Sequence, residues 1–218
     1  MTDPNPEPDS LSAAIADDGD AMPTFDGMQW HTPDAHHIDI LIDSDCWPDD
    51  LVKRLKMRFC QMLDAALAAH EMTGCAVSLL LCSDAKIRQL NHDHRGKDIA
   101  TNVLSFPAAD EDDMPYLADD LDEAARPPRA EIGDIAIAHD TCMREADDSG
   151  ISIDDHVTHL FGHGVLHLLG YDHEQDADAT EMEALEISLL NAMGIANPYG
   201  DAADDKARII TSSTESAS

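Results

Sequence analysis

The sequence predicts an α+β fold in which a single mixed sheet of about four strands is covered by about five helices. Three observations predict it. Short apolar runs of strand length alternate with longer stretches in which apolar residues recur at helical spacing. The first elements follow the order strand, helix, strand, which indicates a parallel pair with a right-handed crossover. The length of 218 residues suits one domain with tails, and the apolar fraction of 43% suffices for a core.

The first predicted unit is a strand over residues 37–42, followed by a helix that starts at Pro48. Apolar residues at helical spacing continue this helix, namely Leu51, Leu55, Phe59, Met62, Leu63 and Leu67. Residues 75–82 are an apolar run of strand length. These three elements are the predicted parallel pair and its crossover helix.

The next helix is predicted to begin after Ser83, whose side chain can accept a hydrogen bond from one of the first free N–H groups. Strands are predicted over residues 102–106, which Pro107 ends, and over residues 132–138. The remaining helices are predicted over residues 139–148, 153–169 and 175–193.

Tails flank the predicted domain. Residues 1–33 contain seven acidic residues and no Lys or Arg, which predicts a disordered acidic tail. Residues 200–218 are predicted to be a second disordered tail, so the folded domain is predicted over residues 34–199. The loop at residues 108–129 is acidic and long for a compact domain, so it is either a functional flap or disordered.

The net charge of −32 is unevenly spread, because eight of the 13 Lys and Arg residues lie between Lys53 and Lys97. High acidity alone argues against a nucleic-acid partner. RNA needs only a local positive potential, however, and this basic segment can supply one. The alternative is a solvated helix face that balances the acidic segments.

Composition also predicts the compartment. The five cysteines have no C-x-x-C spacing, which favours neither a disulfide framework nor a thiolate zinc site. No basic and apolar leader is visible, and no apolar run approaches the length of a membrane span. A cytoplasmic protein without a membrane segment is therefore predicted.

A histidine-rich stretch near the C-terminus carries the chemistry. His163 and His167 are four residues apart, so on a helix their rings project from one face and can reach one ion. Gly170 allows a left-handed turn that ends the helix and returns His173 to the same face. Three protein ligands leave one coordination position open, which is typical of a catalytic zinc site. The sequence thus predicts one Zn²⁺ bound by these three histidines, at the end of a helix-turn.

These histidines have other interpretations. A pair of histidines four apart is often a coincidence in a chain with 12 histidines, but the third after a glycine turn favours a metal. His156 and His159 share the same helical face and are either extra ligands or neighbours of the site. The spacing also matches zinc proteases, yet Gly164 stands where those enzymes carry their glutamate base. A metalloprotease is therefore a poor alternative.

The stretch HGVLHLLGYDH, from His163 to His173, resembles the signature of the YbeY family of bacterial endoribonucleases, H-G-x-L-H-L-x-G-Y-D-H. The resemblance covers about residues 37–199. Further matches are Leu90-Asn91 with Arg95 and Asp98, Thr101 to Pro107, Gly133 to Ile135, Glu181 to Glu186, and Asn197 to Tyr199. Two departures are Asn102, where the family usually has an aspartate, and His94, where it commonly has an aromatic residue.

The resemblance implies a zinc-dependent, single-strand endoribonuclease that acts in 16S rRNA 3′-end maturation and ribosome quality control. Its partners would be the 16S rRNA precursor, the small ribosomal subunit and ribosome-associated proteins in the cytoplasm. His163 and Arg95 are the predicted catalytic residues, with Arg95 neutralising charge on the scissile phosphate. A water activated by the metal and the RNA 2′-hydroxyl are alternative nucleophiles. A ribosome-assembly factor whose metal only stabilises the fold is the alternative function.

The sequence identifies no general base. Asp172 is expected either to orient a histidine ligand or to cap a turn. Asp134 is an active-site carboxylate or a structural residue at a strand end, and Phe106 stacks on a base or belongs to the core.

Overall fold

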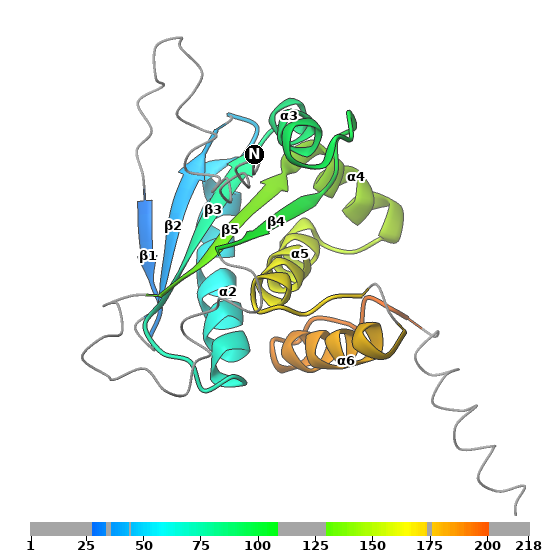
Figure 1. The fold of residues 1–218 in the computed structure, drawn as a ribbon. Coiled ribbons are helices and arrows are strands. Elements are labelled where there is room, and N and C mark those ends of the chain that lie inside the picture. The colour runs from blue at the N-terminus through cyan, green and yellow to red at the C-terminus, as the bar shows by residue number, and fades with distance from the viewer. Residues whose placement is uncertain (1–27, 34–35, 44, 109–129, 174–175, 201–218) are drawn as a thin grey trace, which may run out of the picture.

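The computed structural model describes residues 28–33, 36–43, 45–108, 130–173 and 176–200. Figure 1 shows the elements, which follow one another along the chain. They are β1 (Met28–His31), β2 (His37–Ile42), α2 (Asp49–Ala68), β3 (Cys75–Cys82), α3 (Asp84–Arg95), β4 (Val103–Pro107), β5 (Ala130–Ala138), α4 (His139–Ser149), α5 (Ile153–Leu168) and α6 (Asp176–Ala192). Most of the predicted tails and acidic loop, residues 1–27, 109–129 and 201–218, lie outside the described residues.

The five strands form one mixed sheet in the order β1-β2-β3-β5-β4. The three central strands β2, β3 and β5 run parallel, and the edge strands β1 and β4 pair antiparallel to their neighbours. The predicted parallel pair joined by a crossover helix is confirmed as β2, α2 and β3. The mixed sheet of an α+β fold is likewise confirmed, with five helices among the described residues.

The sheet has one strand more than the four or so that the sequence predicted. The additional strand is β1, which lies inside the segment predicted to be a tail. Only four residues long, it is too short to show an alternating pattern of its own, and its strand character depends on pairing with β2. Trp30 of β1 is buried and contacts Phe59 of α2, so the core extends to this strand.

Helices cover both faces of the sheet (Figure 1). On one face, α2, α5 and α6 pack together in the main core, which includes the stacked rings of Phe59 and Phe161 at 4.4 Å. On the other face, α3 covers a smaller apolar cluster with Ile87 and Leu90. Strand β3 has neighbours on both faces, which explains its nearly continuous apolar sequence.

Cys46, Cys60, Cys75, Cys82 and Cys142 form no disulfide bonds with one another. Among the described residues, no helix is both long enough and apolar enough to span a membrane.

Helix α5 lies directly against the sheet, and a glycine makes this approach possible. A Cβ atom at Gly164 would lie 3.0 Å from Cδ1 of Ile135 on β5 and 3.2 Å from Oγ of Ser105 on β4. Contacts this short require the neighbouring side chains to move. Position 164 therefore faces the sheet and has no room for a longer side chain.

We expect Gly164→Ala to destabilise the fold by about 1–3 kcal/mol, because the added methyl group overpacks the contact with Ile135. Ile135→Val removes the Cδ1 atom of that contact, so the double variant should regain part of the loss. Chemical denaturation of the wild type, both single variants and the double variant measures this coupling. Additive effects of the two substitutions would contradict the proposed contact.

Candidate metal centre

Local interactions fix both ends of α5, and the turn at its C-terminal end is the one that the sequence predicted at Gly170. Ser152 caps the start of the helix by accepting a hydrogen bond from the backbone N–H of Asp155 at 3.0 Å. At the other end, Gly170 has a φ of 87°, the left-handed conformation that glycine adopts without strain. The backbone N–H of Tyr171 then donates to the carbonyl of Leu166 at 3.1 Å, which closes the turn.

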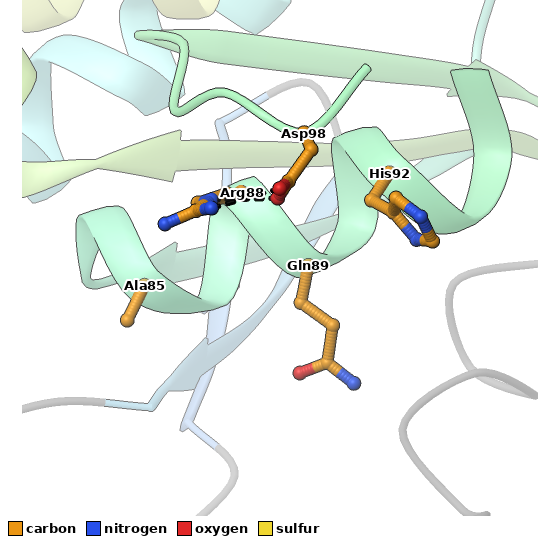
Figure 2. Close-up of a pocket in the computed structure, with 5 residues that line it drawn as sticks. All are labelled: Ala85, Arg88, Gln89, His92 and Asp98. Carbon is orange, nitrogen blue, oxygen red and sulfur yellow. Dashed lines mark hydrogen bonds and ion pairs between the residues drawn. The ribbon is translucent and has the colours of Figure 1, made fainter. Parts of the chain in front are cut away.

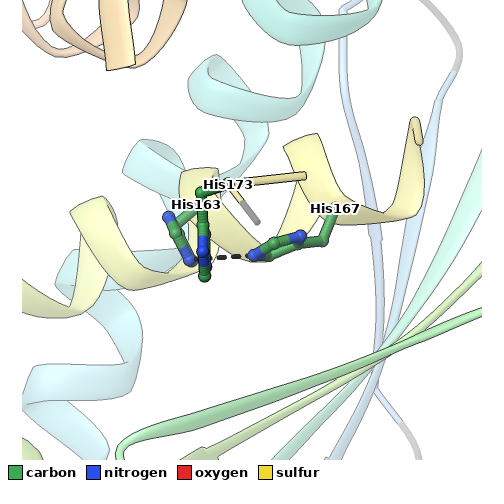
Figure 3. Close-up of side chains that lie close together, drawn as sticks. All are labelled: His163, His167 and His173. Atoms are coloured by element: carbon green, nitrogen blue, oxygen red, sulfur yellow. Dashed lines mark hydrogen bonds between the residues drawn. The ribbon is translucent and has the colours of Figure 1, made fainter. Parts of the chain in front are cut away.

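This turn brings the three predicted histidines together. Figure 3 shows the side chains of His163, His167 and His173 converging from the helix and from the segment after the turn. One ring nitrogen from each lies within 4.8 Å of the others. The Nε2 atoms of His163 and His167 are 3.1 Å apart. His163 and His167 are partly buried, whereas His173 is exposed, so the group is open to solvent on the side of His173.

The tautomer of His167 follows from its surroundings. Its Nδ1 lies 2.8 Å from the carbonyl oxygen of Tyr171, which can only accept, so Nδ1 carries the hydrogen. Burial lowers the pKa of His167, and the neighbouring His163 lowers it further, which favours the neutral ring. A neutral ring protonated at Nδ1 presents the lone pair of Nε2 to the centre of the group.

His163 is oriented by a carboxylate that sequence reasoning did not assign. Its Nδ1 lies 3.4 Å from Oε1 of Glu186 on α6, and Nε2 of His159 lies 3.0 Å from the same oxygen. Tyr199 donates a short hydrogen bond to Oε2 of Glu186. Because a carboxylate only accepts, it favours a hydrogen on Nδ1 of His163 and leaves Nε2 facing the other histidines.

Glu186 is 1% exposed and remains ionised. Burial pushes its pKa upward, but the contacts with the rings of His159 and His163 and the hydrogen bond from Tyr199 outweigh this and hold the pKa at about 2. Burial and the bond to Glu186 together raise the pKa of Tyr199, so its hydroxyl keeps the hydrogen that it donates. Glu186 is therefore a permanent buried anion behind the histidine group.

The donor set fits one metal ion. Two nitrogens bound to zinc at about 2.0–2.1 Å in tetrahedral geometry lie about 3.3 Å apart. The Nε2 atoms of His163 and His167 are 3.1 Å apart, and their Nδ1 atoms face acceptors on the outside of the group. Without an ion between them, two such lone pairs repel each other. His163 and His167 therefore have the spacing of two zinc ligands, and His173 adds a third ring nitrogen within 4.8 Å of them.

His156, by contrast, belongs to a separate polar network. Its Nε2 lies 2.9 Å from Oε2 of Glu145 on α4, and the Nδ2 group of Asn102 donates to the same oxygen at 2.9 Å. An aspartate at position 102, usual in the family, would place a second carboxylate against Glu145. Asparagine suits this position because its amide group donates a hydrogen bond to Glu145, which an aspartate could not do.

Arg95 lies at the C-terminal end of α3, on the opposite face of the sheet from α5. Its Nη2 atom is 3.4 Å from the carbonyl oxygen of Ser105 on the edge strand β4. The side chain of Ser105 faces Gly164, the neighbour of His163. Among the described residues, Arg95 forms no ion pair and no hydrogen bond to the three histidines. The edge strand therefore links it to the centre indirectly.

The basic segment from Lys53 to Lys97 does not form a single surface. Its α2 and α3 parts cover opposite faces of the sheet. On α2, Arg54 contacts Asp50 and Asp154 at 2.7 and 2.8 Å, and Arg58 contacts Asp155 at 2.6 Å. The positive potential that the sequence predicted for this segment is therefore divided between two faces of the sheet, and on α2 it is reduced by these ion pairs.

The α3 part is also partly neutralised, as Figure 2 shows at a shallow pocket on the outer side of this helix. Arg88 forms a bidentate pair with Asp98, at 2.7 and 2.8 Å. The pair lowers the pKa of Asp98, so the carboxylate stays charged at neutral pH and occupies the arginine fork.

The structure also shows the surroundings of three other residues that the sequence singled out as candidates, Asp172, Asp134 and Phe106. Asp172 accepts a hydrogen bond from the backbone N–H of His173 at 2.6 Å, which agrees with the interpretation that it caps the turn. Asp134 is buried within β5. The rings of Phe106 and His94 meet edge to face at 4.9 Å on the α3 side of the sheet. His94 thus makes the ring contact that an aromatic residue at its position would make.

Glu186 and Tyr199 are the site residues that the sequence did not reveal. Both lie in stretches that match the family, but nothing local distinguishes Glu186 from the exposed acids of the same helix. A buried acid on the apolar face of a helix is a detectable signal once the face is known. Position 186 follows Met182 by four residues and precedes Leu190 by four, and both of these are buried.

The fold and the site together define an α+β protein whose three histidines are grouped for one metal ion. The model of the family described as "Endoribonuclease YbeY" matches residues 45–194. The chain belongs to this family, as the histidine motif predicted. The family is one of endoribonucleases, the class of enzyme that the sequence predicted.

Similar proteins from several bacteria carry the same description. The endoribonuclease YbeY of Dinoroseobacter shibae is 51% identical over 140 residues, which are 63% of this chain and 77% of that protein. That of Rhodospirillum rubrum is 47% identical over 150 residues, which are 65% of this chain and 71% of that protein. A solution structure of a Thermotoga maritima protein, 22% identical, covers 74% of this chain and 97% of its own, with a TM-score of 0.45.

We expect Glu186→Gln to weaken zinc binding about 10- to 100-fold, because an amide orients His163 less well and adds no negative charge. Tyr199→Phe, which leaves Glu186 in place without its hydroxyl donor, should weaken binding less. Competition with a chromophoric chelator measures both affinities.

Glu183→Gln makes the same change of charge about one turn away on α6 and serves as the matched control. It should bind zinc like the wild type. Equal affinities for Glu186→Gln and Glu183→Gln would show that Glu186 does not orient the ligand.

Proposed function

We propose that this protein is a zinc-dependent endoribonuclease that cleaves single-stranded RNA in 16S rRNA 3′-end maturation and ribosome quality control. The observation that carries the proposal is the grouping of His163, His167 and His173 in a chain of the endoribonuclease YbeY family. In this proposal the precursor RNA and the small ribosomal subunit are its partners, with ribosome-associated proteins, in the cytoplasm.

The three histidines would hold the zinc, and the side of exposed His173 would admit the RNA. When bound, zinc supplies a Lewis acid for a phosphoryl oxygen and lowers the pKa of a water ligand to about 7. Glu186 would keep His163 in the tautomer that binds a metal, and its charge would offset part of the charge of a bound ion. The carbonyl of Tyr171 does the same for His167 by accepting its Nδ1 hydrogen.

The packing around Gly164 supports phosphodiester chemistry over peptide hydrolysis. Zinc proteases with this histidine spacing carry a glutamate base at the corresponding position. Here the position faces Ile135 and Ser105 at contact distance. A base could not occupy it without displacing α5 from the sheet, so the metalloprotease alternative has no support in this geometry.

Arg95 is the proposed phosphate-binding residue. Its charge is held at the edge of β4 through the Ser105 carbonyl, and no described carboxylate pairs with it. A guanidinium can contact two phosphate oxygens at once and neutralise charge that develops during cleavage. The RNA backbone would then extend from the histidine group across the β4 edge towards α3.

The proposal predicts that His167→Ala abolishes cleavage of a labelled, structured RNA by the metal-loaded protein. The variant loses a ligand, so metal binding should fall in parallel. His92→Ala removes an exposed histidine on α3 and is the matched control, expected to cleave like the wild type. A peptide pool incubated in the same way should remain intact.

Each other outcome identifies an alternative. A wild-type protein that binds zinc, is stabilised by it and cleaves neither substrate would be an assembly factor with a structural metal. Cleavage of peptides and not of RNA would show that the protein is a metalloprotease. Undiminished RNA cleavage by His167→Ala would exclude the histidine group as the active centre.

Arg95→Ala is expected to reduce RNA cleavage on the order of 100-fold while zinc affinity stays unchanged, because Arg95 contacts none of the three histidines. Arg95→Lys should restore part of the rate, since it keeps the charge and loses the bidentate fork.

Arg88→Ala on the same helix is the matched control. Arg88 is already bound by Asp98, so its removal should change cleavage little. Single-turnover kinetics measures the cleavage rates of both alanine variants. Equal losses of rate would show that Arg95 attracts RNA only through its charge and does not contact the scissile phosphate.

A further inference from the structure

A second group of metal-ligand atoms lies at the other end of the sheet. The ligand atoms of Cys46, His139 and Asp140 all lie within 4.8 Å of one another. Cys46 lies in the connection between β2 and α2, and the other two residues begin α4 directly after β5. The parallel strands β2, β3 and β5 all end at this edge, which is the edge where ligands commonly bind in parallel sheets.

The backbone on both sides of this group is fixed by hydrogen bonds and packing. Trp47, next to Cys46, donates its indole N–H to the carbonyl of Cys82 at 3.0 Å. The ring of Trp47 also meets His139 edge to face at 5.2 Å. Asp84 holds the start of α4 by accepting hydrogen bonds from the backbone N–H and the hydroxyl of Thr141, at 2.9 and 2.8 Å. Only side-chain rotations remain to close the group around an ion.

The two segments also present different donor types. Nδ1 of His139 lies 2.8 Å from Oδ1 of Asp140, so this carboxylate oxygen accepts from the ring and a second oxygen remains. The side chain of Asp140 is 64% exposed, which leaves the group open for an ion to enter. A thiolate, an imidazole and a carboxylate together suit zinc and cobalt, and the thiolate disfavours magnesium and calcium.

This group is distant from the three-histidine centre. Helix α5 contacts the beginning of β5, where the side chain of Leu168 lies against Gly133. His139 follows Gly133 by six residues, which corresponds to about 20 Å along a strand. An ion at one group therefore cannot share ligands with the other.

We propose that Cys46, His139 and Asp140 form a second metal site, which takes zinc or a chemically similar ion such as cobalt. The site does not depend on the function proposed for the histidine centre. It ties the start of α4 to the connection that precedes α2, so its ion stabilises the fold without taking part in RNA cleavage.

Cobalt(II) distinguishes the two sites, because only the second contains a thiolate. We expect the metal-free, full-length protein to retain two cobalt ions per chain after gel filtration and to show a near-ultraviolet thiolate-to-cobalt charge-transfer band. Cys46→Ser should lose the band and one ion. His167→Ala should keep the band and lose the other ion. A single bound ion without the band in the wild type would overturn the proposal.

Cys60→Ser is the matched control, since Cys60 lies within α2, in the helix that follows Cys46, and outside the group. A band that survives in Cys46→Ser but disappears in Cys60→Ser would assign the thiolate elsewhere and overturn the proposal. Far-ultraviolet circular dichroism confirms that each variant is folded.

A measurement on the wild type avoids substitutions altogether. Stoichiometric zinc, two ions per chain, should protect Cys46 from alkylation, as read by peptide mass spectrometry. Unprotected Cys46 would contradict the site. RNA cleavage is measured separately: Cys46→Ser should cleave RNA like the wild type, and a failure of RNA cleavage in both proteins would leave the cobalt result unchanged.

Discussion

The close packing of α5 against the sheet is the constraint on which the rest of the structure depends. Two of the three grouped histidines lie on this helix, and its turn at Gly170 positions the third. Gly164 lets the helix backbone approach β4 and β5, and the opposite side of α5 packs on α2 and α6. The helix is consequently fixed from several directions. Side chains at its solvent-facing end inherit that rigidity, which ligands of a metal require.

Burying Glu186 is the main cost of building the centre. A buried carboxylate without partners costs several kcal/mol, and in this fold the cost is offset by the hydroxyl of Tyr199 and by the nearby rings of His159 and His163. His159, which the sequence left as an extra ligand or a neighbour of the site, is one of these partners. The anion in turn stabilises positive charge on the far side of His163. A cation held between the rings would therefore be stabilised by the carboxylate behind His163.

The parts of the site that depend on local spacing could be predicted from the sequence, and the parts that depend on tertiary packing could not. The grouping of His163, His167 and His173 follows from a helix period and one glycine turn, so it was predicted correctly. Glu186 meets His163 only because α6 packs on α5, which no local pattern encodes. In the same way, β1 forms a strand because β2 is beside it, and the basic segment is divided because its two helices cover opposite faces.

This division changes how an acidic chain can attract RNA. Arg54 and Arg58 bind the aspartates of the first turn of α5, where those acids also face the positive end of the helix dipole. These arginines therefore anchor α5 to α2 and have little charge left for a phosphate. Arg95 differs, because its described partner is the neutral carbonyl of Ser105. Salt screens the long-range repulsion between an acidic chain and RNA within about 10 Å. At short range, a cation whose charge is not paired, such as that of Arg95, can therefore attract a phosphate more strongly than a larger number of paired ones.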